Sequence, residues 1–259
     1  MIAFLYSLSD LAVAILFGSG VALVFAIAPL LRVRLFGHVS EANSEIARTT
    51  MTTITGFTGV VLAFSLVQAQ GNLRNVEKTV ANEALQLNQM DRLLTDYGDA
   101  KLATIREAVR AYAESVVADE WPQLSEHGSS QRTADLFRTL SQLILATQPT
   151  PGRQSVIYAD LVKTVDQLAE SREDRLGETD LGLPPIYWEV IGVLLALLVG
   201  FAAFVEPRCG RVLSLGGLGA GLALLVTLVF VFDQPFLGNV SVRPDPIVRA
   251  LQIMHARPN

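Results

Sequence analysis

Four long stretches of this chain contain almost no charged residue. They cover residues 11–31, 49–70, 185–205 and 212–232. About 20 apolar residues, rising about 1.5 Å each, cross a hydrocarbon core of roughly 30 Å. Because lipid offers no partner for backbone polar groups, stretches of this length must be helices. The pattern therefore predicts a transmembrane hairpin within residues 1–70 and a second one within residues 185–232.

A polar insert, residues 71–184, separates the two hairpins and carries 12 basic and 18 acidic residues. Its first part repeats apolar residues at helical spacing, at Leu73, Val76, Val80, Leu87, Met90 and Leu94. The stripe starts directly after the second span, with no proline between them. We therefore expect the second span to continue into the insert as one rod, about 70 Å long from Thr49 to Leu94.

The rest of the insert also has helical periodicity. A second stripe runs from Leu102 to Val116, and Pro122 is expected to end that helix. Ser129 or Ser130 can cap a third helix. A fourth follows the break at residues 149–152 and continues to about Leu176. The fold class predicted is all-α: four transmembrane helices in two hairpins, a soluble bundle of about four helices between them, and a tail at residues 233–259.

Composition narrows the class of protein. Of the 259 residues, 51% are hydrophobic and 17% are charged, which is too little charge for an ordinary cytosolic enzyme. The net charge is −5 with no basic block, so no nucleic-acid partner is expected. One cysteine and three dispersed histidines give no disulfide, zinc or other metal motif. With no catalytic triad order or nucleotide motif either, we expect neither an enzyme nor a cofactor.

Two acids, Glu83 and Asp119, interrupt the apolar stripes of the insert. A buried carboxylate is costly unless it is paired. We expect each to pair with an arginine such as Arg106, Arg172 or Arg175 and to hold the bundle in register. The alternative is a contact to an ion or a ligand.

The second span has an unusual face at steps of three or four residues. It consists of Thr50, Thr53, Phe57, Val61, Phe64 and Gln68. Hydroxyls at one end, an apolar constriction and then an amide would suit the lining of a pore. The alternative is plain helix packing, with the hydroxyls bonded to their own backbone. In the fourth span, Gly217 and Gly221 form a GxxxG pair that would permit close helix approach.

Several motifs, in order along nearly the whole chain, resemble the bestrophin-like family of bacterial membrane proteins. They are Asn82-Glu83-Ala84, Asp119-Glu120-Trp121-Pro122, Arg172 and Arg175, Leu183-Pro184 before Trp188, Asp233-Gln234-Pro235-Phe236-Leu237-Gly238, and then Val242, Pro244, Pro246-Ile247 and Ala250-Leu251. Bestrophins are pentameric anion channels in which the second span lines the pore. The resemblance implies a neck at Phe57, Val61 and Phe64, with Thr50 and Thr53 toward one mouth.

The resemblance has two departures. The segment from Pro235 to Gly238 has one residue more than the bestrophin Pro-Phe-Gly segment, and the acidic run that follows it in that family is missing, so a calcium clasp is not expected. Bestrophins keep the insert and the termini inside the cell. The short loops at residues 32–48 and 206–211 carry five arginines, which weakly favours the opposite orientation.

We therefore expect a multi-pass protein of the bacterial inner (plasma) membrane that forms a homo-oligomer, by analogy a pentamer, and conducts small anions. A second reading stays open: the insert is a sensing or binding module, and the spans only anchor and dimerise it.

Overall fold

The computed structural model describes residues 9–99, 102–126 and 128–257. Within these ranges the regular elements are all helical. The chain divides into two compact units, and the long helix α3 (Glu41–Tyr97) contributes to both. Unit 1 comprises Met1–Leu73 and Gly182–Ser241, and unit 2 comprises Arg74–Leu181 and Val242–Asn259.

Unit 1 contains the four helices that are long and apolar enough to span a membrane. They are α2 (Asp10–Phe36), the first part of α3, α8 (Pro185–Ala202) and α9 (Cys209–Asp233). Four residues join α2 to α3 and six join α8 to α9, so each pair forms a hairpin. The predicted fold class, with four transmembrane helices and a helical insert, is confirmed.

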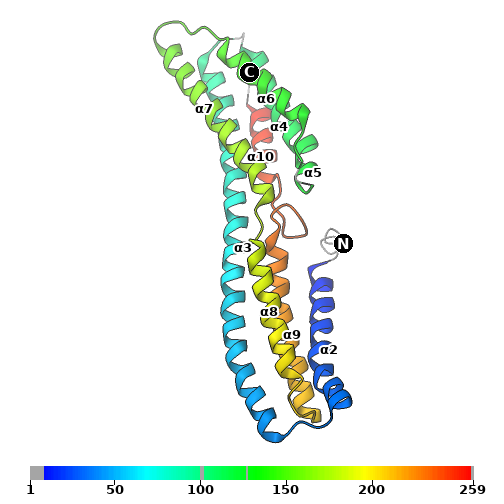
Figure 1. Ribbon diagram of the computed structural model, residues 1–259. Helices are drawn as coiled ribbons and strands as arrows, with labels where there is room; N and C mark the ends of the chain where they lie inside the picture. Colours follow the sequence, from blue (N-terminus) through cyan, green and yellow to red (C-terminus); the bar gives the residue numbers. More distant parts are fainter. Residues whose placement is uncertain (1–8, 100–101, 127, 258–259) are drawn as a thin grey trace. The chain divides into compact units, whose positions relative to one another are not determined.

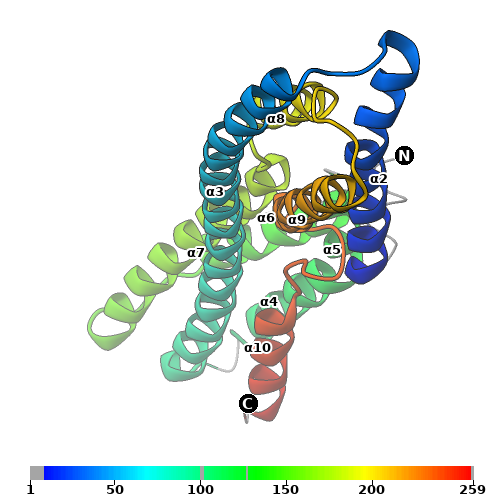
Figure 2. The same ribbon diagram turned by 90° about the horizontal axis from the view of Figure 1, so that it is seen from below.

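The core of unit 1 takes apolar side chains from all four spans, among them Phe25, Leu62, Leu198 and Leu222. Helix α2 packs lengthwise against α9, and Figures 1 and 2 show the two helices side by side. The two helices approach each other closely at Gly219, where an added Cβ atom would lie 2.9 Å from Phe25 Cδ2. Gly217 and Gly221 have nothing within 4 Å of an added Cβ, so the predicted GxxxG pair does not mediate packing within the chain.

Unit 2 is a helical bundle. It contains the second part of α3, α4 (Ala103–Ser115), the π-helical turn η2 (Val116–Glu120), α5 (Trp121–Leu124), α6 (Gln131–Leu145), α7 (Arg153–Gly177), η3 (Glu178–Asp180) and α10 (Asp245–Ala256). The stripe on α3 is buried as predicted, with Val76, Val80, Leu87 and Met90 fully enclosed. The predicted rod is also confirmed, since α3 continues without interruption through 57 residues.

Two expectations about helix ends in unit 2 can be compared with the structure. Ser130, one of the two candidates, caps α6 and accepts a hydrogen bond from Thr133 N at 3.3 Å. The expected stop before Pro122 is wrong. The chain widens into the π-turn instead, where Trp121 N bonds Val116 O, and Pro122 falls in the first turn of α5. A proline is tolerated there because first-turn N–H groups need no helical partner.

Helix α10 was not predicted from the tail sequence. It packs on α4, and Arg110 Nη2 donates to Met254 O at 2.8 Å. Ile247, Ala250 and Met254 form its buried face. The end of the chain therefore belongs to the bundle of unit 2.

Candidate functional site: a buried ion cluster and the exposed face of α3

A fully buried carboxylate, Glu83, lies on α3 in unit 2. Its Oε2 accepts a hydrogen bond from Arg175 Nε at 2.6 Å, and its Oε1 accepts from Arg175 Nη2 at 3.2 Å. The same Oε1 accepts from the Tyr112 hydroxyl at 2.9 Å. The pairing expected for Glu83 is thus confirmed, with Arg175 as the partner. Charge-assisted pairs of this kind join α3 to α7 and α4.

Arg175 bridges Glu83 to a second buried acid, Glu120. Glu120 Oε2 accepts from Arg175 Nη2 at 2.8 Å, and Glu120 Oε1 accepts from Arg172 Nη2 at 2.5 Å. The Trp121 ring lies 5.7 Å from the Arg175 guanidinium carbon, within cation–π range. Two acids and two arginines therefore balance their charges where no solvent reaches Glu83, Glu120 or Arg175.

The structure puts Glu120, rather than Asp119, at the buried position. A regular helix would bring Asp119 onto the stripe of Val109, Tyr112 and Val116. The π-turn adds one residue to that turn and so advances the register to Glu120. Asp119 is partly exposed, accepts from Ser115 Oγ at 2.8 Å and lies 3.5 Å from Arg132. Asp119 therefore does pair with an arginine, but the partner is Arg132 rather than one of the three named arginines, and the expected burial is wrong.

Burial and neighbouring charges shift the pKa values of Tyr112 and Arg175. Burial raises the pKa of Tyr112 well above its ordinary value, and the adjacent Glu83 raises it further, so the hydroxyl keeps its proton and donates. Burial lowers the pKa of Arg175, but Glu83 and Glu120 raise it by more, and the net pKa is raised. The ion pairs and the Tyr112 hydrogen bond thus join α3, α4, η2 and α7.

A second buried pair was missed from the sequence. Asp91 Oδ1 accepts from Arg106 Nε at 3.0 Å, and Asp91 Oδ2 accepts from Arg257 Nη1 at 2.5 Å. Arg257 follows α10 directly, so this pair anchors the tail to α3 and α4. The signal was present, because Asp91 lies four residues after Leu87 on the apolar stripe.

The membrane part of α3 exposes aromatic rings. Phe57 and Phe64 are 64% and 68% exposed, and they share a face with the exposed Thr53 and Gln68. Val61 packs partly against the core of unit 1 and lies at the edge of this face. The two rings are seven residues apart, or about 10.5 Å along the helix.

The hydroxyls of Thr50 and Thr53 bond the backbone of their own helix. Thr50 Oγ1 donates to Ile46 O at 2.9 Å, and Thr53 Oγ1 donates to Thr49 O at 3.4 Å. Gln68 Nε2 donates to Asn72 Oδ1 at 3.0 Å. The hydroxyl proton of Thr53 is therefore held least firmly of these and is the easiest to turn toward another acceptor.

The segment at residues 233–238, at the end of α9, packs within unit 1. Asp233 is buried at the last residue of α9, and its Oδ1 accepts from Leu183 N at 2.6 Å, just before α8 begins. Pro235 is buried and Phe236 partly so. Gly238 has φ +83°, a backbone conformation that a side chain disfavours. These residues tie the end of α9 to the start of α8.

Four apolar spans in two hairpins and a helical insert between them define a multi-pass, all-α membrane protein. Residues 18–247 match the family model of the bestrophin-like domain, and the chain belongs to the bestrophin-like family.

Solved structures agree with this assignment. The crystal structure of a bacterial bestrophin homolog from Klebsiella pneumoniae is 17% identical, with a TM-score of 0.60 over 95% of this chain and 99% of that one. A single-substitution variant of that homolog gives 14% identity and a TM-score of 0.66 over 96% and 100%. No curated protein matches the chain. The identities are low, so these structures support the fold alone.

Proposed function

We propose that this protein is an oligomeric anion channel of the bacterial inner membrane, with α3 lining the pore. The observation that carries the proposal is the exposure of Phe57 and Phe64 on one face of α3. The opposite face of the helix packs into unit 1, where Leu62 is buried. Copies of α3 around a symmetry axis would turn these rings toward each other, and a pentamer is the arrangement the family suggests.

Conduction would then depend on partial dehydration. In the oligomer, the Phe57 side chains of all copies would form one apolar constriction and the Phe64 side chains another. Such constrictions gate by wetting and dewetting, and Val61 lies beside them. Thr50 and Thr53 lie toward one mouth and Gln68 toward the other. The looser hydrogen bond of Thr53 makes its hydroxyl the better donor to a passing anion. The insert would set the opening of the pore through the continuous helix.

The test is chloride and bicarbonate flux into liposomes that contain the purified full-length protein. Phe57→Ala and Phe64→Ala should change the rate or the selectivity of flux. The control is Leu16→Ala, because Leu16 is a large apolar residue of α2 that is also more than half exposed and lies outside the proposed pore. Particle images should show five-fold symmetry with α3 at the axis.

A monomer without flux would contradict the proposal. A dimer that tolerates both phenylalanine substitutions would favour the tethered sensing module instead.

The orientation of the protein in the membrane can be determined by labelling Cys209. Cys209 is the single cysteine of the chain, is exposed, and begins α9 beside the short loop. Labelling by an impermeant thiol reagent in intact cells would place the short loops outside and the insert inside, as in bestrophins. Protection would place the short loops inside, as the arginine count suggests.

A further inference from the structure

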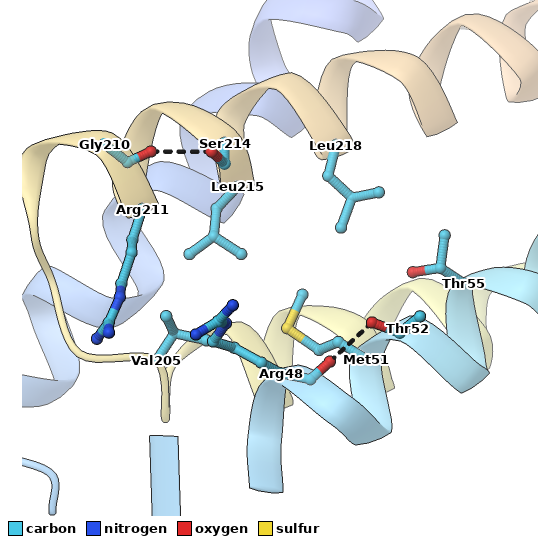
Figure 3. Close-up of a pocket in the computed structure, with 10 residues that line it drawn as sticks. All are labelled: Arg48, Met51, Thr52, Thr55, Val205, Gly210, Arg211, Ser214, Leu215 and Leu218. Atoms are coloured by element: carbon cyan, nitrogen blue, oxygen red, sulfur yellow. Dashed lines mark hydrogen bonds between the residues drawn. The ribbon is translucent and has the colours of Figure 1, made fainter. Parts of the chain in front are cut away.

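A cavity of about 430 Å³ lies within unit 1 between α3 and α9. Figure 3 shows Arg48, Met51 and Thr55 of α3 on one wall and Arg211 and Leu215 of α9 on the other. The cavity has two chemically different ends, which neither the proposed pore nor the ion cluster uses.

The polar end carries a surplus positive charge. Arg211 Nη1 lies 2.9 Å from Glu206 Oε2, and Arg211 Nη2 lies 3.6 Å from Glu41 Oε1. Arg208 contacts the same two acids, so these two arginines are balanced. Arg48 makes no ion pair with any residue in the part of the chain that the structure describes. Its guanidinium therefore remains available to an anionic group.

The hydroxyls at this end do not compete for that role. Thr52 Oγ1 donates to Arg48 O at 3.1 Å, and Ser214 Oγ donates to Gly210 O at 2.9 Å (Figure 3). Their protons are committed to the backbone. The Arg48 guanidinium is thus the donor that a bound anion would meet.

The apolar end extends into the charge-free part of the spans. Met51, Leu215 and Leu218 line it. Arg48 and Arg211 directly precede the uncharged stretches at residues 49–70 and 212–232, so the polar end lies at the membrane interface. A ligand that fits has a negative head at the interface and a hydrocarbon chain beneath it.

The cavity lies on the opposite side of α3 from the proposed pore. At 100° per residue, Arg48 and Thr55 are about 160–180° from Phe57 around the helix. A ligand in the cavity would therefore contact the side of α3 opposite Phe57 and would not lie in the proposed pore.

We propose that this cavity binds an anionic phospholipid, with the headgroup phosphate on Arg48 and an acyl chain along Leu215 and Leu218. Planar guanidinium groups suit phosphate oxygens, and charge complementarity selects an anionic over a zwitterionic lipid. The site does not depend on conduction, and so its test is separate from that of the channel.

The experiment uses the full-length protein in a neutral detergent. Phosphatidylglycerol, phosphatidylcholine or inorganic phosphate is added, and bound lipid is counted by native mass spectrometry alongside the unfolding midpoint. We expect phosphatidylglycerol to bind and raise the midpoint, phosphatidylcholine to bind more weakly, and inorganic phosphate to have no effect. Arg48→Ala should weaken phosphatidylglycerol binding by about tenfold.

Two variants make the result specific. Arg34→Ala removes an equally exposed arginine at the end of α2 and should leave lipid binding unchanged. Thr55→Trp should displace the lipid by filling the cavity. The proposal is overturned if Arg48→Ala binds phosphatidylglycerol like the unaltered protein, if the two lipids bind equally, or if inorganic phosphate protects as well as the lipid. A structure of the assembled oligomer with a neighbouring subunit in the cavity would overturn it as well.

Discussion

The two parts of α3 differ in the side chains that they bury and expose. In unit 2 the helix buries carboxylates, Glu83 and Asp91, and each finds arginine partners within the same unit. In unit 1 the helix exposes aromatic rings, Phe57 and Phe64, which the described residues of unit 1 leave about two-thirds exposed. The exposed rings of the first part need lipid or other copies of the chain to cover them. The buried acids of the second part already have their partners within unit 2.

The largest expected loss of stability comes from the ion cluster of unit 2, which tests whether the buried acids depend on their arginines. Arg175→Ala would leave Glu83 and Glu120 buried without their shared partner. Breaking a buried pair from one side costs about 3–5 kcal/mol, and the free energy of unfolding of unit 2 should fall accordingly. Denaturant unfolding of the full chain in detergent measures it.

Arg138→Ala is the matched control, because its ion pair with Asp135 is largely exposed and should contribute little. Equal losses from the two variants would show that burial does not matter to the cluster.

The membrane part of α3 gives the next test. Leu62 is 1% exposed in the core of unit 1, and Leu62→Ala should cost roughly 3 kcal/mol from lost packing. Phe57→Ala, on the other face, should leave the unfolding midpoint of the dissociated chain nearly unchanged. A large loss for Phe57→Ala under these conditions would mean that the ring packs within the chain.

Helix contact in unit 1 is tested at a glycine pair. Gly219→Ala places a Cβ 2.9 Å from the Phe25 ring and should destabilise by about 1–3 kcal/mol through overpacking. Gly217→Ala meets open space and should be neutral. The comparison is read from thermal unfolding in detergent. Identical midpoints would contradict the close approach of α2 and α9.

Tyr112→Phe gives the smallest effect. It removes one hydrogen bond to Glu83, worth about 1 kcal/mol. Because the folded-state pKa of Tyr112 is raised, its contribution is present below about pH 10 and is lost as the pH rises above that value. The stability difference from the unaltered protein should therefore be constant near neutral pH and shrink in strong alkali. A difference that grew with pH would reverse the sign of the shift.

Much of the fold followed from local pattern. The apolar spans, the rod of α3 and an arginine partner for Glu83 were predicted, because apolar periodicity and the cost of buried charge can be read over a few residues. Three features did not follow. The packing glycine is Gly219 because the position of Phe25 on another helix decides it. The docking of α10 depends on Arg110 and Asp91, far away in the sequence. The role of Glu120 depends on a change of helical period.

The π-helical turn has a consequence for the sequences of related proteins. Val116–Glu120 accommodates one residue beyond what ordinary α-turns would need. A chain that lacked Ala118 would bring the same glutamate to Arg172 and Arg175 through a regular helix. Relatives in the family should therefore gain or lose one residue at this point while keeping the acid. An alignment that forbids gaps inside helices would pair Glu120 with the wrong neighbour.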